Sequence, residues 1–146
     1  MTYLKLSRIV LPALALMGTT TYADEHDPSA PRVPADQRAV AKALKNPIKA
    51  TLESVAKGKA IYEGAGACSG CHGLHGDGKG PSAASMNPGP RNFTNPAFQQ
   101  KRADGELMWV LKNGSPGTGM VQLVDVAISE EEGWHVINYV RSLERK

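Results

Sequence analysis

The sequence has few aromatic residues, few cysteines and little net charge. Aromatic side chains make up 5% of the 146 residues, which is a thin supply for a hydrophobic core. The two cysteines, Cys68 and Cys71, are too few for a four-ligand zinc site, and no two of the histidines form an H-x-x-x-H pair that would complete one. The formal net charge of +3 gives no strong indication of a nucleic-acid partner.

The first 23 residues are typical of a secretory signal peptide. Lys5 and Arg8 precede an apolar run over 9–17, and Thr21-Tyr22-Ala23 forms a cleavage site with small residues at its first and third positions. The apolar run is well short of the ~20 residues that a membrane-spanning helix needs, so an uncleaved anchor is the weaker alternative. We therefore expect cleavage after Ala23 and export to the periplasm, with two positive charges removed.

Between the signal peptide and the main domain lies a stretch with an acidic start and several prolines. Asp36 as an N-cap and Asn46-Pro47 as a stop predict a short helix here, with Val40 and Leu44 on one face. The stretch is either ordered against the domain or a tether. Three lysines recur in it at three- and four-residue spacing, and they form a solvated face or, as the alternative, a docking patch: Lys42, Lys45 and Lys49. We divide the chain into three parts: a signal peptide (1–23), an extension (24–50) and a main domain (51–146).

The most informative stretch is Cys68-Ser69-Gly70-Cys71-His72. Two thiols one helical turn apart, followed at once by a histidine, are typical of a site that attaches haem c, with the histidine as iron ligand. A redox dithiol is the alternative, but it would need a preceding strand, whereas residues 54–63 have a helical pattern. We therefore predict one haem c, bound covalently through Cys68 and Cys71, with His72 as an iron ligand. A buried porphyrin would also supply flat apolar surface that the few aromatic residues do not.

Three helices are predicted around this motif. Ser54 is placed to cap a helix that runs to Glu63. Asp104 is placed to cap a second helix over 105–112, which Asn113-Gly114 closes. A capping box over 129–132 opens the last helix. Its apolar residues recur at helical spacing: Trp134, Ile137 and Val140.

The order of these features resembles class I c-type cytochromes. The resemblance covers about residues 54–143 and rests on six stretches: 58–62 (GKAIY), 68–73 (CSGCHG), 76–81 (GDGKGP), 104–109 (DGELMW), 117–120 (GTGM) and 134–143. It implies an all-α cytochrome c fold of about three to five helices around one haem, with the first and last core helices crossing at a small residue. By this resemblance Gly58 would lie against Val136, Tyr139 and Val140. The family usually has proline after the ligand methionine, where this chain has Val121.

The iron needs a second axial ligand, and the sequence offers five candidates: Met86, Met108, Met120, His75 and His135. His75 is too close to His72 to reach the opposite haem face, and Met108 and His135 sit in helices as expected core residues. Met86 lies in a loop rich in serine, asparagine and proline. Met120 follows the glycines of 114–119, which let the backbone lie against a porphyrin. The resemblance implies Met120, with Met86 or an open iron as the alternatives.

Three further residues are candidates for supporting roles. A ligating histidine nearly always donates its second N–H to an acceptor, and the Pro81 carbonyl is a candidate acceptor for His72. The alternative role for Pro81 is a rigid turn. Arg91 and Trp109 are candidates for binding haem propionates, or else a surface charge and a core aromatic residue.

A His72/Met120 pair predicts an electron-transfer protein rather than an enzyme. The thioether favours ferrous iron and raises the reduction potential relative to bis-histidine ligation. Six ligands leave no place for a small-molecule substrate, so electrons would pass through the haem edge between transient redox protein partners of a respiratory chain. We expect a monomer that contacts membranes only through its partners. The alternatives are a cytochrome subunit of a larger dehydrogenase complex, and a haem sensor or peroxidase with an open iron.

Overall fold

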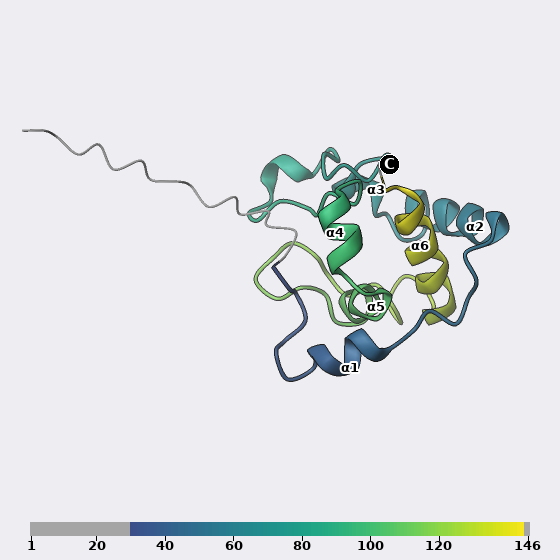
Figure 1. Cartoon of the computed structure of the whole chain (residues 1–146). Helices are drawn as coiled ribbons and strands as arrows, with labels where there is room; N and C mark the ends of the chain where they lie inside the picture. The colour runs from purple at the N-terminus through teal and green to yellow at the C-terminus, as the bar shows by residue number, and fades with distance from the viewer. Residues whose placement is uncertain (1–29, 145–146) are drawn as a thin grey trace, which may run out of the picture.

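The computed structural model of the protein describes residues 30–144 (Figure 1). These residues form α1 (Arg38–Ala43), α2 (Leu52–Glu63), α3 (Ser69–His72), the 3-10 helix η1 (Ala83–Ser85), α4 (Pro96–Lys101), α5 (Asp104–Asn113) and α6 (Glu130–Ser142). Their one β pairing is an isolated bridge between Val124 and Ile128. The all-α prediction is confirmed, and the described residues contain more than five helices because α1, α3 and α4 are short additions.

The predicted signal peptide lies outside the described residues. Within residues 30–144, no helix combines the length and the apolar character needed to cross a membrane.

The main contact between helices in the fold is the crossing of α2 and α6, which lie side by side in Figure 1. A Cβ atom at Gly58 would collide with the carbonyl oxygen of His135 and would lie 3.0 Å from Cβ of Tyr139, so only glycine allows this approach. The predicted crossing at Gly58 is confirmed. Its nearest partners are His135 and Tyr139, of which Tyr139 was predicted, and the other two predicted partners, Val136 and Val140, line a cavity.

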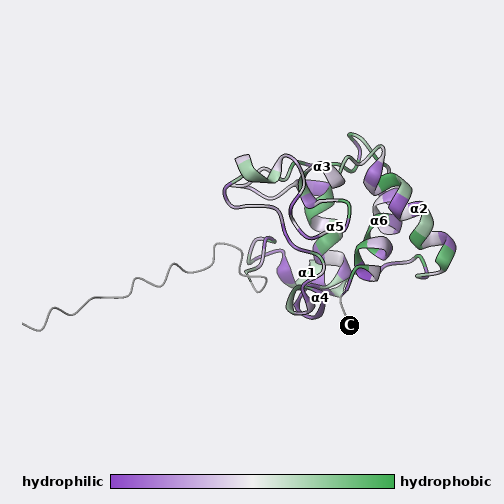
Figure 2. Ribbon diagram, turned by 90° about the horizontal axis from the view of Figure 1, so that it is seen from above, coloured by the Kyte–Doolittle hydropathy of each residue, from purple (hydrophilic) through white to green (hydrophobic). Residues whose placement is uncertain are grey.

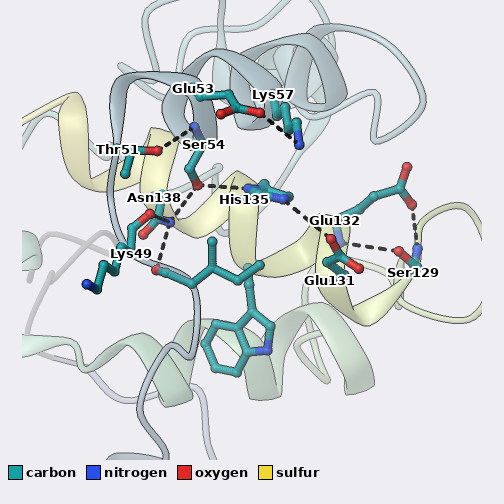
Figure 3. A network of polar contacts seen from close by, with 12 residues as sticks. Lys49, Thr51, Glu53, Ser54, Lys57, Ser129, Glu131, Glu132, His135 and Asn138 are labelled. Carbon is teal, nitrogen blue, oxygen red and sulfur yellow. Dashed lines mark hydrogen bonds and ion pairs between the residues drawn. The ribbon is translucent and has the colours of Figure 1, made fainter.

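The start of α2 differs from the prediction because Thr51, and not Ser54, is its N-cap. The Thr51 hydroxyl accepts a hydrogen bond from the backbone N–H of Ser54 (3.1 Å). The Ser54 hydroxyl lies 2.8 Å from Nδ1 of His135 and accepts a hydrogen bond from Nδ2 of Asn138 (2.8 Å), so it joins α2 to α6 (Figure 3). His135 is buried in this network, as expected for a core residue. A buried polar network whose members are paired favours one packing arrangement.

Asn138 also holds the connector between α1 and α2. Its Nδ2 lies 3.1 Å from the Ile48 carbonyl oxygen and 3.4 Å from that of Lys49, and its Oδ1 accepts a hydrogen bond from Asn46 (2.9 Å). In Figure 3, Lys49 and Asn138 lie side by side next to Ser54. Asn138 is 4% exposed, so these bonds satisfy an amide that water does not reach.

The capping box predicted at the start of α6 is confirmed. The Ser129 N–H donates to the Glu132 carboxylate (2.7 Å), and the Ser129 hydroxyl accepts from the Glu132 N–H (3.2 Å; Figure 3). At α5 the prediction is wrong, because Asp104 is a helical residue and not the cap. The Glu106 carboxylate accepts the backbone N–H of the residue before α5 (2.8 Å). Asp104 instead pairs with Arg141 of α6 (2.7 Å).

The described part of the extension is ordered against α5. A Cβ atom at Gly105 would collide with the carbonyl oxygen of Ala41, so α1 and α5 meet backbone to backbone. Ala41 is therefore the buried residue of α1. Leu44, on the predicted apolar face, also lies against Gly105 and is 45% exposed, whereas Val40 is 75% exposed and does not belong to the core. No side chain caps α1, so the expectation for Asp36 is wrong.

The apolar core consists of two clusters, and α6 contributes to both. One contains Met108, Leu111, Val124, Ile128, Trp134 and Ile137, and the other contains Tyr62, Phe98, Val136, Tyr139 and Val140. Met108 is fully buried, as expected for a core residue. In Figure 2, α2, α5 and α6 each carry hydrophobic and hydrophilic residues, as expected for helices with one face on a core.

Candidate functional site

A cavity opens between α3, α5, α6 and the loops before α1, before α4 and after α5. Its empty volume is about 1090 Å³, the open mouth included. Most of the lining side chains are apolar, and they come from every α-helix except α1. Polar side chains are therefore a minority in the cavity wall.

Both cysteines of the motif and His72 line this cavity. α3 is a single turn in which the His72 N–H donates to the Cys68 carbonyl (2.8 Å), so the three residues lie within one turn, as the motif predicts. Burial raises the pKa of the Cys68 thiol to about 11, whereas reactive dithiols have lowered pKa values, which argues against the dithiol alternative. Residues 30–144 hold no group of three or more acidic, histidine or cysteine side chains suited to a metal ion, so the zinc alternative gains no support.

The His72 imidazole is held in a fixed orientation. Its Nδ1 lies 2.9 Å from the backbone carbonyl oxygen of Arg91. A carbonyl oxygen only accepts, so Nδ1 donates and Nε2 is the nitrogen left for a metal. The ring stacks on Phe93, with centroids 4.3 Å apart and planes 18° apart. Burial lowers the pKa of His72 and outweighs the opposing effect of this hydrogen bond, which favours the neutral imidazole that a metal needs.

Pro81 does not have the role expected for it. The acceptor for His72 is the Arg91 carbonyl, ten residues further along the chain. The backbone N–H of Gly80 donates to the Cys71 carbonyl (3.0 Å), which ties this stretch to the outside of α3, and Pro81 is exposed. The alternative of a surface turn therefore describes Pro81 better.

Of the five candidates for the second axial ligand, only Met86 and Met120 line the cavity. Met108 lies in the core, His135 lies in the polar network with Ser54, and His75 is exposed. The structure thus leaves Met86 and Met120 as the two methionine candidates, as the sequence did.

Hydrogen bonds close the loop that carries Met120. The Ser115 N–H donates to the Met120 carbonyl (2.9 Å), and the Met120 N–H donates to the Thr118 hydroxyl (3.1 Å). Met86 packs on this loop: a Cβ atom at Gly119 would lie 3.3 Å from the Met86 sulfur. The two methionines therefore belong to one wall of the cavity.

Three arginines line the cavity, and only Arg91 was expected there. Arg102 forms an ion pair with the buried Glu106 (3.1 Å). Arg32 belongs to the extension, so nothing in the sequence pattern pointed to it. Trp109, which was expected to share the role of Arg91, lies outside the lining, because its indole N–H donates to the side chain of Gln37 (2.6 Å).

The Ser115 hydroxyl is a second feature that sequence reasoning missed. It is buried, its residue lines the cavity, and it has no hydrogen-bond partner among the described residues. Buried hydroxyls are normally paired, so this one indicates a partner supplied by a group in the cavity. In the sequence, the position of Ser115 in the glycine-rich loop before Met120 is the one feature that could have indicated this role.

Comparison with known proteins identifies the fold. Residues 55–144 match the sequence model of the family described as Cytochrome c. No curated protein matches the chain in sequence.

Among the solved structures that resemble the chain are two from different bacteria. One is from the reducing HAO-like protein complex of Kuenenia stuttgartiensis, with a TM-score of 0.59, 31% identity, and coverage of 68% of this chain and 47% of that one. The other is cytochrome CL from the marine methylotrophic bacterium Methylophaga aminisulfidivorans, with a TM-score of 0.50, 22% identity, and coverage of 75% and 63%. The chain thus spans about half of the first structure and under two thirds of the second.

Proposed function

The chain belongs to the cytochrome c family, and from this premise we propose that it is an exported carrier of single electrons with one haem c. Membership of the family implies a covalently bound haem c and an electron-transfer fold. The number of haems, the ligands, the location and the partners are parts of the proposal. The observation that carries it is the placement of Cys68, Cys71, His72 and Met120 in the wall of one apolar cavity.

The described residues suit a haem. The cavity is mostly apolar, as a porphyrin needs, and the polar groups in its wall suit the carboxylates of the propionates. The Ser115 hydroxyl, buried without a partner, would gain an acceptor from such a group. The haem would supply one-electron redox chemistry at its iron.

Each site residue has a defined task in this proposal. Cys68 and Cys71 would hold the porphyrin through two thioethers. His72 would ligate through Nε2, since Nδ1 is committed to the Arg91 carbonyl. Met120 would be the second iron ligand, as the family resemblance implies; its loop is closed by its own hydrogen bonds, and Met86 packs on that loop. Because the histidine and the loop are held in place, little would rearrange between the two oxidation states.

A shuttle of this kind would work as a monomer in the periplasm. It would meet its donor and its acceptor over small interfaces with fast dissociation. Residues 1–23 support export by their pattern alone. Mass spectrometry of the secreted protein should give a chain that begins at Asp24, and a chain that keeps Met1–Ala23 would contradict the cleaved leader.

A subunit of a larger redox complex is the second candidate. It is favoured by the likeness to a chain of a multi-protein complex, at 31% identity. Size-exclusion chromatography of the native protein in moderate salt separates the two, since a shuttle should run as a monomer and a subunit should co-elute with other chains.

The central test is the visible spectrum of the purified protein, oxidised and reduced, with and without carbon monoxide. We expect haem that resists extraction, a weak far-red band in the ferric form, and no spectral change with carbon monoxide. The band should disappear in Met120→Ala and persist in Met86→Ala, which is the matched control from the same wall. Loss of the band in Met86→Ala alone would assign the ligand to Met86. Ready carbon monoxide binding by the unmodified protein would mean an open iron and favour a sensor or peroxidase.

A further inference from the structure

Residues ahead of the family match contribute to the cavity. The match to the Cytochrome c family begins at residue 55, yet Ala30, Arg32 and Val33 line the cavity together with the haem-attachment motif. Val33 is 2% exposed, which is as buried as the residues of the core. We call residues 30–37 the strap. Its sequence gave no sign of this role, since it is a proline-containing stretch without a periodic pattern.

Side chains from distant parts of the chain fix the strap at both ends. At its start, the Arg91 guanidinium donates to the Ala30 carbonyl (2.6 Å). At its end, the indole of Trp109 donates to Gln37 (2.6 Å), and α1 then packs on Gly105 of α5. Arg91 is also the residue whose carbonyl orients His72, so the strap is tied to the residue that supports the iron ligand.

The charges in the cavity wall indicate what Arg32 does. Arg102 is paired with Glu106, so these two side chains add no net charge. Arg32 lines the cavity but makes no hydrogen bond or ion pair with any described residue. A charged group facing a largely apolar cavity is costly unless an opposite charge or hydrogen-bond acceptors meet it.

We infer that Arg32 binds a propionate carboxylate of the haem, so that the strap is part of the cofactor site. This inference rests on the proposed function, because it needs a haem in the cavity. The ligand class is a carboxylate, for which a guanidinium offers a planar pair of donors. Arg32 is thus a cofactor-positioning residue that lies ahead of residues 55–144, which the family model matches.

Two measurable consequences follow from a guanidinium next to a propionate. Arg32 favours the less positive, ferrous haem, so its loss should favour the ferric form and lower the reduction potential. Arg32 also favours the ionised propionate and keeps the pKa of that carboxyl low. Without Arg32, the pH range in which the potential changes with propionate ionisation should therefore move upward.

The experiment is a spectroelectrochemical titration of the holoprotein from pH 5 to pH 9 in three variants. Arg32→Ala removes the charge, Arg32→Lys keeps it without the paired donors, and Lys42→Ala removes an equal charge from an exposed position on α1 that does not line the cavity. At the wild-type midpoint potential, Arg32→Ala should raise the ferric-to-ferrous ratio by about threefold, for one charge acting over roughly 10 Å in a partly aqueous medium. Arg32→Lys should restore part of this change, and Lys42→Ala should leave the ratio close to that of the wild type.

The outcomes separate this inference from the proposed function. Covalent haem and an unchanged far-red band in Arg32→Ala, together with the ratio change and the upward pH shift, would support it. Equal ratios in Arg32→Ala and Lys42→Ala would overturn it while leaving the carrier proposal intact. A changed ferric-to-ferrous ratio in Arg32→Ala without a shift of the pH range would also overturn the inference. The charge of Arg32 would then act on the iron without binding a propionate. A wild-type protein without covalent haem would overturn both proposals.

Discussion

At the α2–α6 crossing two helices meet backbone to backbone at Gly58, whereas the cavity wall with Met86 and Met120 consists of two loops. The crossing tolerates no Cβ atom at its contact point and is reinforced by the bonded pair Ser54 and Asn138. The loop wall is held by side-chain packing and by hydrogen bonds within the loop, and a Cβ atom at Gly119 would meet the flexible side chain of Met86, at 3.3 Å, and not a backbone. The helix crossing should therefore be rigid and the loop wall more adaptable. We expect the crossing and the wall to respond differently to substitution.

The largest expected effect comes from removing the backbone contact at the crossing. Gly58→Leu places a side chain where the His135 carbonyl lies, so α2 and α6 must separate. We expect the free energy of unfolding to fall by about 3 kcal/mol or more, as for severe overpacking. Chemical denaturation of the purified protein measures this. Ala56→Leu, on the exposed side of the same helix, is the control and should change little. Equal effects of the two variants would show that the crossing is not a rigid contact.

An intermediate effect is expected in the loop wall. Met86→Ala removes the side chain that packs on Gly119, and a half-buried methionine contributes about 1.5 kcal/mol, below the range for fully buried ones. The far-red band should persist at 25 °C but disappear at a lower temperature than in the wild type. Met86→Leu should restore most of the difference, since it refills the same space. An unchanged melting profile of the band in Met86→Ala would show that the wall does not depend on Met86.

The smallest effect is expected in the capping box at the start of α6. Hydrogen bonds from the Ser129 N–H and hydroxyl hold the pKa of Glu132 below its ordinary value of 4.5. A carboxylate with a lowered pKa stabilises the fold above about pH 4.5, and this contribution is lost as the pH falls through the folded-state pKa. Thermal melts between pH 6 and pH 3 should therefore show a shallower decline for Glu132→Gln than for the wild type. Asp36→Asn is the control, because it removes an exposed carboxylate that has no hydrogen bond or ion pair with any described residue. The same decline in Glu132→Gln as in the wild type would contradict the assignment.

The parts of the fold that could be predicted are those with local or periodic signals. The motif around Cys68 and the capping box at Ser129 are short patterns whose chemistry is complete within a few residues. Gly58 was assigned to the crossing through the family resemblance. Its exact partners could not be assigned, because they depend on how α6 is rotated about its axis.

The rest could not be predicted because it depends on contacts between distant residues. The acceptor for His72 is a backbone carbonyl, at Arg91, and any residue could supply it. The role of Arg32 depends on the path of the strap, which Trp109 and Arg91 fix from far along the chain. Thr51 replaced Ser54 as the cap of α2 because Ser54 is used by Asn138 and His135.

The position of α6 at the end of the chain also sets an order of events during biosynthesis. Cys68 packs against the cluster to which Val136, Tyr139 and Val140 of α6 belong. A chain is made from its N-terminus, so the motif is finished before the helix that covers it exists. If haem is attached to Cys68 as proposed, the thiol would be more accessible before α6 docks on α2 than afterwards. The late completion of the core would then favour attachment before the fold is complete.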